Sequence, residues 1–189
     1  MAKVQISSPS CRFFYPWPLV LVTSVDENGK PNIITIGASC ICSSSPPTVG
    51  VAIGVGQYSL GLIERTKDFG VNLPDRGQLF ESDYCGTVSG RDLNKFEAAG
   101  LTVQPPSLIT SPLIAECPVS MECKLLERVV LGNHEWVIGE IVAVHVEERY
   151  LTGERLNTEA LDPIVCYAGE YWSIGEKLER WHFARGGRP

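Results

Sequence analysis

A run of β-branched residues, an asparagine–glycine pair and a second such run constrain the fold of this 189-residue chain more than any other feature. Residues 19–25 (LVLVTSV) predict a β-strand, and residues 32–41 predict the strand that returns beside it. Between them, Asn28 and Gly29 supply the positive φ angles that a tight hairpin turn demands. The chain therefore has to pair antiparallel strands close to its beginning.

Further strands follow along the chain. Proline cannot donate to the hydrogen-bond ladder of a sheet, so Pro46 and Pro47 end the returning strand. Additional strands are expected over residues 48–53, 69–73, 119–131 and 136–146, the last two joined at 132–134.

Helices are few in this pattern. Ser59 can act as the N-cap of a short helix that is suggested by Leu60, Leu62, Ile63 and Thr66. The stretch from 75 to 112 is mixed, and only residues 93–99 look helical within it. The tail from Leu151 is expected to be mostly irregular. Strands joined by hairpins, with few and short helices, predict a mainly β protein whose antiparallel sheet closes into a barrel. We expect the whole chain, 1–189, to form this single domain.

The charge balance excludes some classes of partner. Sixteen Lys and Arg against twenty-two Asp and Glu give a net charge of −6, so the chain is a poor candidate for binding a nucleic-acid polymer or an anionic membrane. No apolar run reaches the length of a membrane span, and the start of the chain lacks the basic-then-apolar pattern of a secretory signal. We therefore expect a cytoplasmic protein.

The cysteines predict free thiols rather than a disulfide framework. Their number is odd, they are scattered, and none forms a CxxC pair. With only three histidines and none at ligand spacing from a cysteine pair, a structural zinc site is not expected. We expect most of these thiols to be buried. The seven cysteines are Cys11, Cys40, Cys42, Cys85, Cys117, Cys123 and Cys166.

Four strings resemble the flavin reductase-like, FMN-binding split-barrel family, and most of all its flavoredoxin-type members. In chain order they cover residues 16–53, 57–74, 83–96 (DYCGTVSGRDLNKF) and 132–141 (GNHEWVIGEI), within a resemblance that runs from about Pro16 to Trp172. The resemblance implies a six-stranded Greek-key barrel with short flanking helices. It also implies a homodimer with one FMN per subunit near the interface, acting either as an NAD(P)H:flavin reductase or as an electron carrier.

The same residues can be interpreted by the chemistry that FMN needs. A site for FMN requires donors at the phosphate, small residues beside the ring and some apolar cover. Ser59 at a helix start offers a hydroxyl and free N–H groups, and Lys95 offers a positive charge. Alone, a serine-rich turn, an N-cap serine and a lysine are ordinary surface features. The positions that match the family's flavin-contacting segments are Ala38, Ser39, Cys40, Ile41, Ser43, Ser45, Ser59, Lys95 and Trp172.

Some positions depart from the family pattern. Gln57 stands where members often carry arginine, Asn94 where they often carry aspartate, and Cys40 where many have an aromatic residue. His134 falls where related flavin reductases place a histidine near the nicotinamide or flavin ring, which makes it the candidate catalytic residue. An exposed turn histidine is an equal alternative.

The expected ligands are FMN, with FAD as a second candidate, and NAD(P)H as substrate. The chain lacks a glycine fingerprint for a dinucleotide, so the residues do not select NADH or NADPH. A redox partner protein is a further expectation. Two alternatives stay open: a flavin-binding protein that stores or senses FMN without catalysis, and a β-barrel interaction module with no cofactor.

Overall fold

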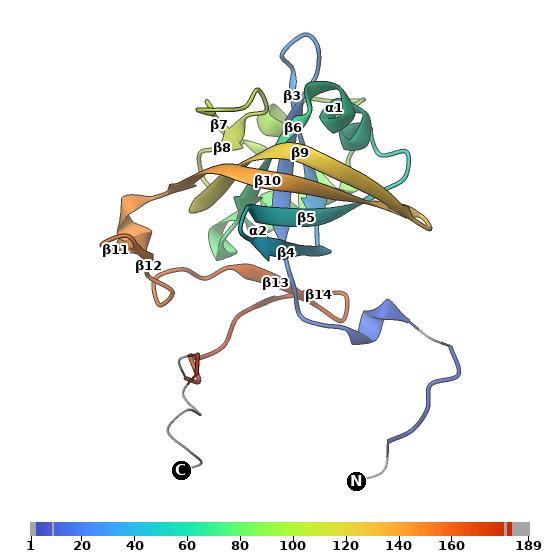
Figure 1. Cartoon of the computed structure of the whole chain (residues 1–189), viewed down its shortest axis with the longest axis vertical. Helices are drawn as coiled ribbons and strands as arrows, with labels where there is room; N and C mark the ends of the chain where they lie inside the picture. Colours follow the sequence, from blue (N-terminus) through green and yellow to red (C-terminus); the bar gives the residue numbers. More distant parts are fainter. Residues whose placement is uncertain (1–2, 9, 180, 183–189) are drawn as a thin grey trace.

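The computed structural model describes residues 3–8, 10–179 and 181–182. The seven longest strands in these residues form one antiparallel sheet, which curves around the core in Figure 1. Its strands are β2 (Val20–Val25), β3 (Pro31–Ile36), β4 (Ser39–Ser44), β5 (Pro47–Gly54), β6 (Asp68–Leu73), β9 (Val119–Leu131) and β10 (His134–Val146). They are hydrogen-bonded in the order β3-β2-β6-β9-β10-β5-β4.

The first hairpin forms where the sequence predicts it. β2 pairs antiparallel with β3 across a turn in which Gly29 has φ +80°. Asn28 does not adopt a positive φ, so that part of the prediction is wrong. Instead, Asp26 Oδ1 accepts hydrogen bonds from the backbone N–H groups of Asn28 (2.8 Å) and Lys30 (2.9 Å). The bond from Lys30 is the main cause that lowers the pKa of Asp26.

The single strand expected over residues 32–41 is interrupted, which corrects the prediction. β3 ends at Ile36, a bend follows at Gly37, and β4 begins at Ser39. β3 and β4 nevertheless occupy the two ends of the sheet order. The bend therefore carries the chain from one edge of the sheet to the other and closes the barrel. When β3 and β4 are taken as one interrupted strand, six strands surround the core, and the predicted mainly β barrel is confirmed.

Three α-helices flank the barrel within the described residues: α1 (Tyr58–Thr66), α2 (Leu79–Thr87) and α3 (Lys95–Ala99). The first and third lie where the sequence predicts helices. α2 was not predicted, because LFESDYCGT contains glycine and several poor helix formers. Packing on β3 stabilises it, since Thr35 Oγ1 donates to the carbonyl oxygen of Ser82 at 2.6 Å.

The tail is more regular than expected. β13 (Ile164–Tyr167) pairs with β14 (Glu170–Ser173) and with β1 (Trp17–Pro18), forming a small second sheet below the barrel in Figure 1. β13 pairs with a segment near the other end of the chain, which no local pattern indicates. The remaining short elements are β7 (Val103–Gln104), β8 (Leu113–Ile114), β11 (Leu151–Thr152), β12 (Arg155–Leu156) and the 3-10 turns Cys11–Phe13, Arg76–Gln78 and Glu148–Tyr150.

The barrel core is apolar and tightly packed. Phe69 of β6 is fully buried among residues of β2, β5 and β9. Gly139 of β10 provides the space for its ring, because a Cβ atom at position 139 would lie 2.6 Å from Phe69 Cζ. A side chain at this position would displace the largest residue of the core.

The cysteines are free thiols throughout the described residues. Cys85, Cys117 and Cys123 are buried as expected, and burial raises the pKa of Cys85 to about 11. The expectation of burial is wrong for the three exposed cysteines, Cys11, Cys40 and Cys42. None of the helices that the structure describes is long and apolar enough to span a membrane.

Candidate functional site

A cavity of about 330 Å³ lies between the closing bend of the barrel and helices α2 and α3. Its lining comes from β3, the bend at Gly37, the end of β5, the start of β10 and the two helices. It brings together three residues that the sequence singles out: Ala38, Lys95 and His134. The closure of the barrel and the packing of the helices on β3 thus create one site from segments far apart in the chain.

Small residues form one wall of the cavity. The backbone N–H of Ala52 donates to the carbonyl oxygen of Ala38 at 2.9 Å, so the two residues lie side by side on neighbouring strands. Gly54 follows on the same strand, two residues beyond Ala52, and therefore faces the same side of the sheet. A wall of methyl groups and bare backbone admits a flat ring close to the main chain.

Lys95 places a buried positive charge at this cavity. It is the first residue of α3 and is 4% exposed, and its Nζ donates to the carbonyl oxygen of Cys85 at 2.6 Å. Among the described residues, no carboxylate forms an ion pair with it. Burial lowers the pKa of Lys95, partly opposed by the neighbouring Cys85 thiol. An ammonium in this position is stabilised by any anion that enters the cavity.

The local sequence explains how Lys95 comes to point inward. Asn94 is the N-cap of α3, and its side-chain oxygen accepts a hydrogen bond from the backbone N–H of Phe96 at 3.1 Å. Phe96, 2% exposed, anchors the helix in the core beside Leu21 and Ile33. Because the start of the helix is fixed in this way, the Lys95 side chain reaches the backbone of α2 at Cys85.

His134 also lines the cavity. It is the first residue of β10, is exposed, and pairs with Gly54 of β5. Its Nδ1 lies 2.8 Å from Asn133 Oδ1, and the carbonyl oxygen of Asn133 accepts from the backbone N–H of Val55. The contact between His134 Nδ1 and the Asn133 side chain orients the imidazole. The exposed ring is open to a molecule that approaches from solvent.

Most of the other candidates on β4 do not line this cavity. Ser39 is half-buried, and its hydroxyl lies 3.5 Å from a backbone carbonyl oxygen before β2. Cys40 and Ile41 are exposed on the strand itself. Ser43 Oγ accepts from the backbone N–H of Ser45 at 3.1 Å, as in an ordinary serine turn.

The structure corrects the predicted role of Ser59 as an N-cap. α1 begins two residues earlier than expected, at Tyr58, and Gln57 is its N-cap without a side-chain hydrogen bond. Ser59 therefore lies inside the first turn and is 2% exposed. Its hydroxyl accepts from Asn32 Nδ2 at 2.8 Å. The two-residue shift turns the hydroxyl toward Asn32 of β3 instead of across the start of the helix.

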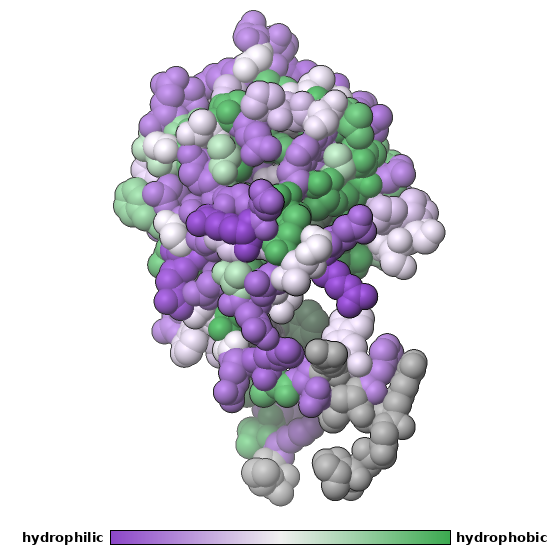
Figure 2. Space-filling view, turned by 90° about the vertical axis from the view of Figure 1, so that its left-hand side faces the viewer, coloured by the Kyte–Doolittle hydropathy of each residue, from purple (hydrophilic) through white to green (hydrophobic). Residues whose placement is uncertain are grey.

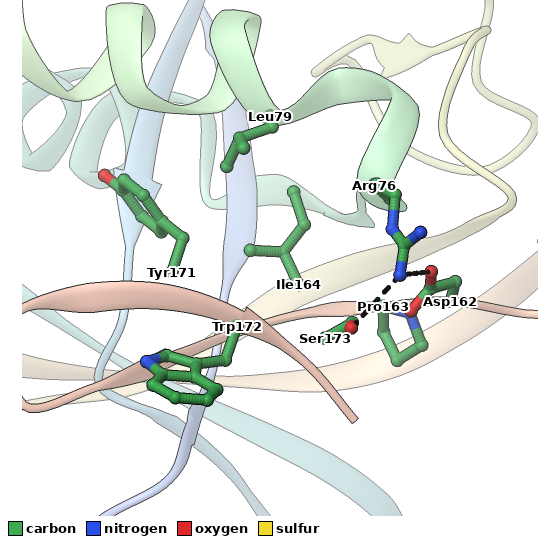
Figure 3. Close-up of a pocket in the computed structure, with 8 residues that line it drawn as sticks. All are labelled: Arg76, Leu79, Asp162, Pro163, Ile164, Tyr171, Trp172 and Ser173. Carbon is green, nitrogen blue, oxygen red and sulfur yellow. Dashed lines mark hydrogen bonds and ion pairs between the residues drawn. The ribbon is translucent and has the colours of Figure 1, made fainter. Parts of the chain in front are cut away.

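Trp172 lines a second, smaller cavity of about 240 Å³ (Figure 3). Leu79 and Ile164 contribute apolar surface there. At one end, Arg76 forms an ion pair with Asp162 at 2.8 Å. Trp172 is not among the residues that line the cavity beside Lys95.

Some lining residues were not predicted. Ala52 and Gly54 are unremarkable in the sequence, and only their pairing opposite Ala38 and His134 gives them a role. Gln57 also lines the cavity, at the position where the family resemblance leads one to expect an arginine. Lys95 is therefore the cationic residue of the described lining.

Comparisons with known proteins agree with one another. The family model described as a flavin reductase like domain matches residues 12–175. A flavin reductase of Pseudomonas putida is 31% identical over 133 residues, which cover 70% of this chain and 75% of that protein.

Two solved structures are similar over nearly the whole chain. The flavoredoxin of Desulfovibrio vulgaris (Miyazaki F) is 30% identical with a TM-score of 0.88, covering 97% of this chain and 100% of that one. A flavoredoxin from Methanosarcina acetivorans is 28% identical with a TM-score of 0.89, covering 98% and 99% of the two chains.

Proposed function

Because the chain belongs to the flavin reductase-like domain family, we propose that it binds FMN in the cavity beside Lys95 and transfers electrons from NAD(P)H through that flavin. The buried ammonium of Lys95 is the observation that supports this most strongly. A buried cation without a carboxylate partner is costly, and the dianionic phosphate of FMN compensates it. The names of its relatives, a flavin reductase and two flavoredoxins, support a flavin as the cofactor.

The remaining lining fits the other parts of FMN. The wall formed by Ala38, Ala52 and Gly54 allows the isoalloxazine ring to lie against backbone, where N–H and carbonyl groups reach its polar edge. A volume of about 330 Å³ is within the usual range for small-ligand sites, about 300–1,000 Å³. FAD carries the same ring and a phosphate at the same place, so it remains a second candidate.

In this proposal the protein binds and orients, and the cofactor carries the redox chemistry. Bound flavin supplies a two-electron acceptor for hydride. Lys95 holds the phosphate, and the wall of small residues fixes the ring. His134 lies at the exposed side of the cavity, where it contacts the incoming nicotinamide. The acceptor that takes the electrons afterwards is either free flavin, as in a flavin reductase, or a redox partner protein, as for an electron carrier.

Filling the cavity tests the location of the site. Ala52→Trp places a large ring against the wall of small residues, so we expect loss of FMN binding in a folded protein. Val103→Trp, at a position 44% exposed on β7, is the matched control and should bind FMN as the wild type does. The measurement is quenching of flavin fluorescence on titration with apoprotein. Wild-type protein that binds no flavin, or an Ala52→Trp protein that binds it as tightly, would contradict the proposal.

Ser59→Ala should lower stability without changing FMN affinity. The substitution removes the acceptor for Asn32 Nδ2, a buried hydrogen bond whose loss costs about 1–3 kcal/mol. Urea unfolding of the apoprotein measures the first quantity and FMN titration the second, with Ser44→Ala, at an exposed position of β4, as the control. If FMN affinity falls about fivefold to tenfold, as for one lost hydrogen bond of about 1 kcal/mol, the Ser59 hydroxyl reaches the phosphate after all.

We also propose that the protein is a homodimer whose interface forms part of the flavin site. Tyr167, Trp172 and Trp181 of the tail are 49%, 52% and 92% exposed, and Leu131 at the tip of the β9–β10 hairpin is 61% exposed. Figure 2 shows hydrophobic residues gathered toward the right-hand side of that view. Such exposed apolar surface favours association. Light scattering should give the mass of a dimer at micromolar concentration, and a monomer that still binds FMN would contradict this.

A further inference from the structure

Two exposed cysteines on β4 are separated by a single residue. Cys40 and Cys42 are both free and exposed, on the strand that ends the sheet order. β4 lies at the lower edge of the barrel in Figure 1. Cys42 Sγ is 3.9 Å from the carbonyl oxygen of Cys40, so its thiol is directed back toward its neighbour. Nothing in the flavin chemistry described above uses this pair.

The backbone at the second of the two cysteines is irregular. In the pairing of β4 with β5, Ile41 lies opposite Val49 and Ser43 opposite Thr48, which leaves Cys42 without a partner residue. This is a β-bulge, and a bulge bends the strand and re-aims the side chains beside it. In a regular extended strand two side chains at this spacing stand parallel and apart, whereas here the Cys42 thiol turns back and donates to the carbonyl oxygen of Cys40.

The electrostatics agree with close contact between the thiols. The pKa of Cys40 is raised, first by partial burial and then by the charge and the hydrogen bond of Cys42. Ala38, two residues before Cys40, lines the cavity with Lys95. The pair therefore lies on the strand that leads out of this cavity.

We propose that Cys40 and Cys42 form a dithiol site that reacts with low-molecular-weight disulfides and closes to an intrachain disulfide. The thiolate of one cysteine attacks a sulfur of the small disulfide, which forms a mixed disulfide and releases one thiol. The second cysteine then attacks the sulfur of the first, breaks the mixed bond and releases the second thiol. The two cysteines lose two electrons and two protons, and the small disulfide gains both. This site is independent of flavin binding.

Oxidised glutathione added to the full-length protein tests this directly. After the exchange, the remaining thiols are blocked with iodoacetamide and the peptide containing Cys40 and Cys42 is analysed by mass spectrometry. We expect that peptide to carry neither glutathione nor the alkyl group, and to be lighter than the reduced peptide by two hydrogens. The reaction should become faster above neutral pH, because more of Cys40 is deprotonated.

Variants that lack one of the two cysteines distinguish closure of an intrachain disulfide from the simple reactivity of an exposed thiol. In Cys40→Ser and in Cys42→Ser the remaining cysteine should keep glutathione as a mixed disulfide, since no second thiol resolves it. Cys11, an exposed cysteine elsewhere in the chain, is the matched control. In the wild type it should keep glutathione, and Cys11→Ser should leave the closure of the pair unchanged. A wild-type peptide that carries glutathione on both cysteines, one that stays reduced, or a disulfide between two chains would each overturn the proposal.

Discussion

Replacing Lys95 by methionine should weaken FMN binding by about tenfold to 150-fold, while riboflavin binding changes much less. A charge-assisted hydrogen bond contributes about 1.5–3 kcal/mol, and riboflavin has no phosphate to accept it. Methionine keeps most of the length of the buried side chain, so the loss reports on the charge rather than on packing. The measurement is a calorimetric titration of the variant and the wild type with each of the two ligands.

Two further results define what Lys95 does. Lys124→Met, at an exposed position of β9, removes an equal charge outside the cavity and should leave both affinities unchanged. The apoprotein of Lys95→Met should be as stable as the wild type or more so, because the substitution removes a buried cation that lacks a carboxylate partner. Equal losses of affinity for FMN and riboflavin would place the phosphate elsewhere.

Glu122→Ala should destabilise the protein by about 3–5 kcal/mol, which we expect to be the largest loss of stability from a single polar residue. The carboxylate of Glu122 is fully buried in β9. It accepts hydrogen bonds from the backbone N–H groups of Ser107 and Leu108, both at 2.6 Å, and of Ile109 at 3.1 Å. His145 Nε2 lies 2.7 Å away. Alanine leaves three backbone donors without an acceptor, and the loop that carries them loses its anchor.

The dependence of this effect on pH has a definite sign. Burial alone raises the pKa of Glu122, but the hydrogen bonds from Ser107 and Leu108 hold it below its ordinary value of 4.5. A carboxyl whose pKa is lower in the folded state than in the unfolded state stabilises the fold at pH values above its ordinary pKa. This contribution is lost as the pH falls through the folded-state pKa. Urea unfolding should therefore show a difference between wild type and Glu122→Ala that is constant near pH 7 and shrinks below about pH 4.

Glu127→Ala is the control for this experiment, because Glu127 is exposed on the same strand. It should change the free energy of unfolding by about 0.5 kcal/mol or less at every pH. A Glu122→Ala protein as stable as this control would show that the loop does not need its carboxylate anchor.

The strands were the most predictable part of the fold. β10 is rich in β-branched residues, β9 has two valines near its end before a glycine turn, and β5 begins at Pro47, so local sequence is sufficient for them. α2 lacks a helical pattern and depends on its contact with β3, and β13 depends on pairing with β1 across the length of the chain. Such non-local contacts override local propensity, and a single sequence does not display them.

The candidate site was predictable in part for the same reason. Lys95, His134 and Ala38 stand in strings that resemble the family, and the structure brings them to one cavity. Ala52 and Gly54 became site residues only through the register of β5 with its neighbours. The orientation of Ser59 depended on a shift of two residues at the start of α1, which lies below the precision of any N-cap pattern.

An anaerobic titration of the FMN-loaded protein with NADH and with NADPH tests the central claim most directly. The absorption band of oxidised flavin should bleach with about one equivalent of one of the two nucleotides, because hydride transfer reduces the flavin by two electrons. Readmitting air should restore the band. A band that stays unchanged with both nucleotides, in protein that holds FMN, would contradict an NAD(P)H-dependent oxidoreductase and would indicate a protein that stores or senses flavin instead.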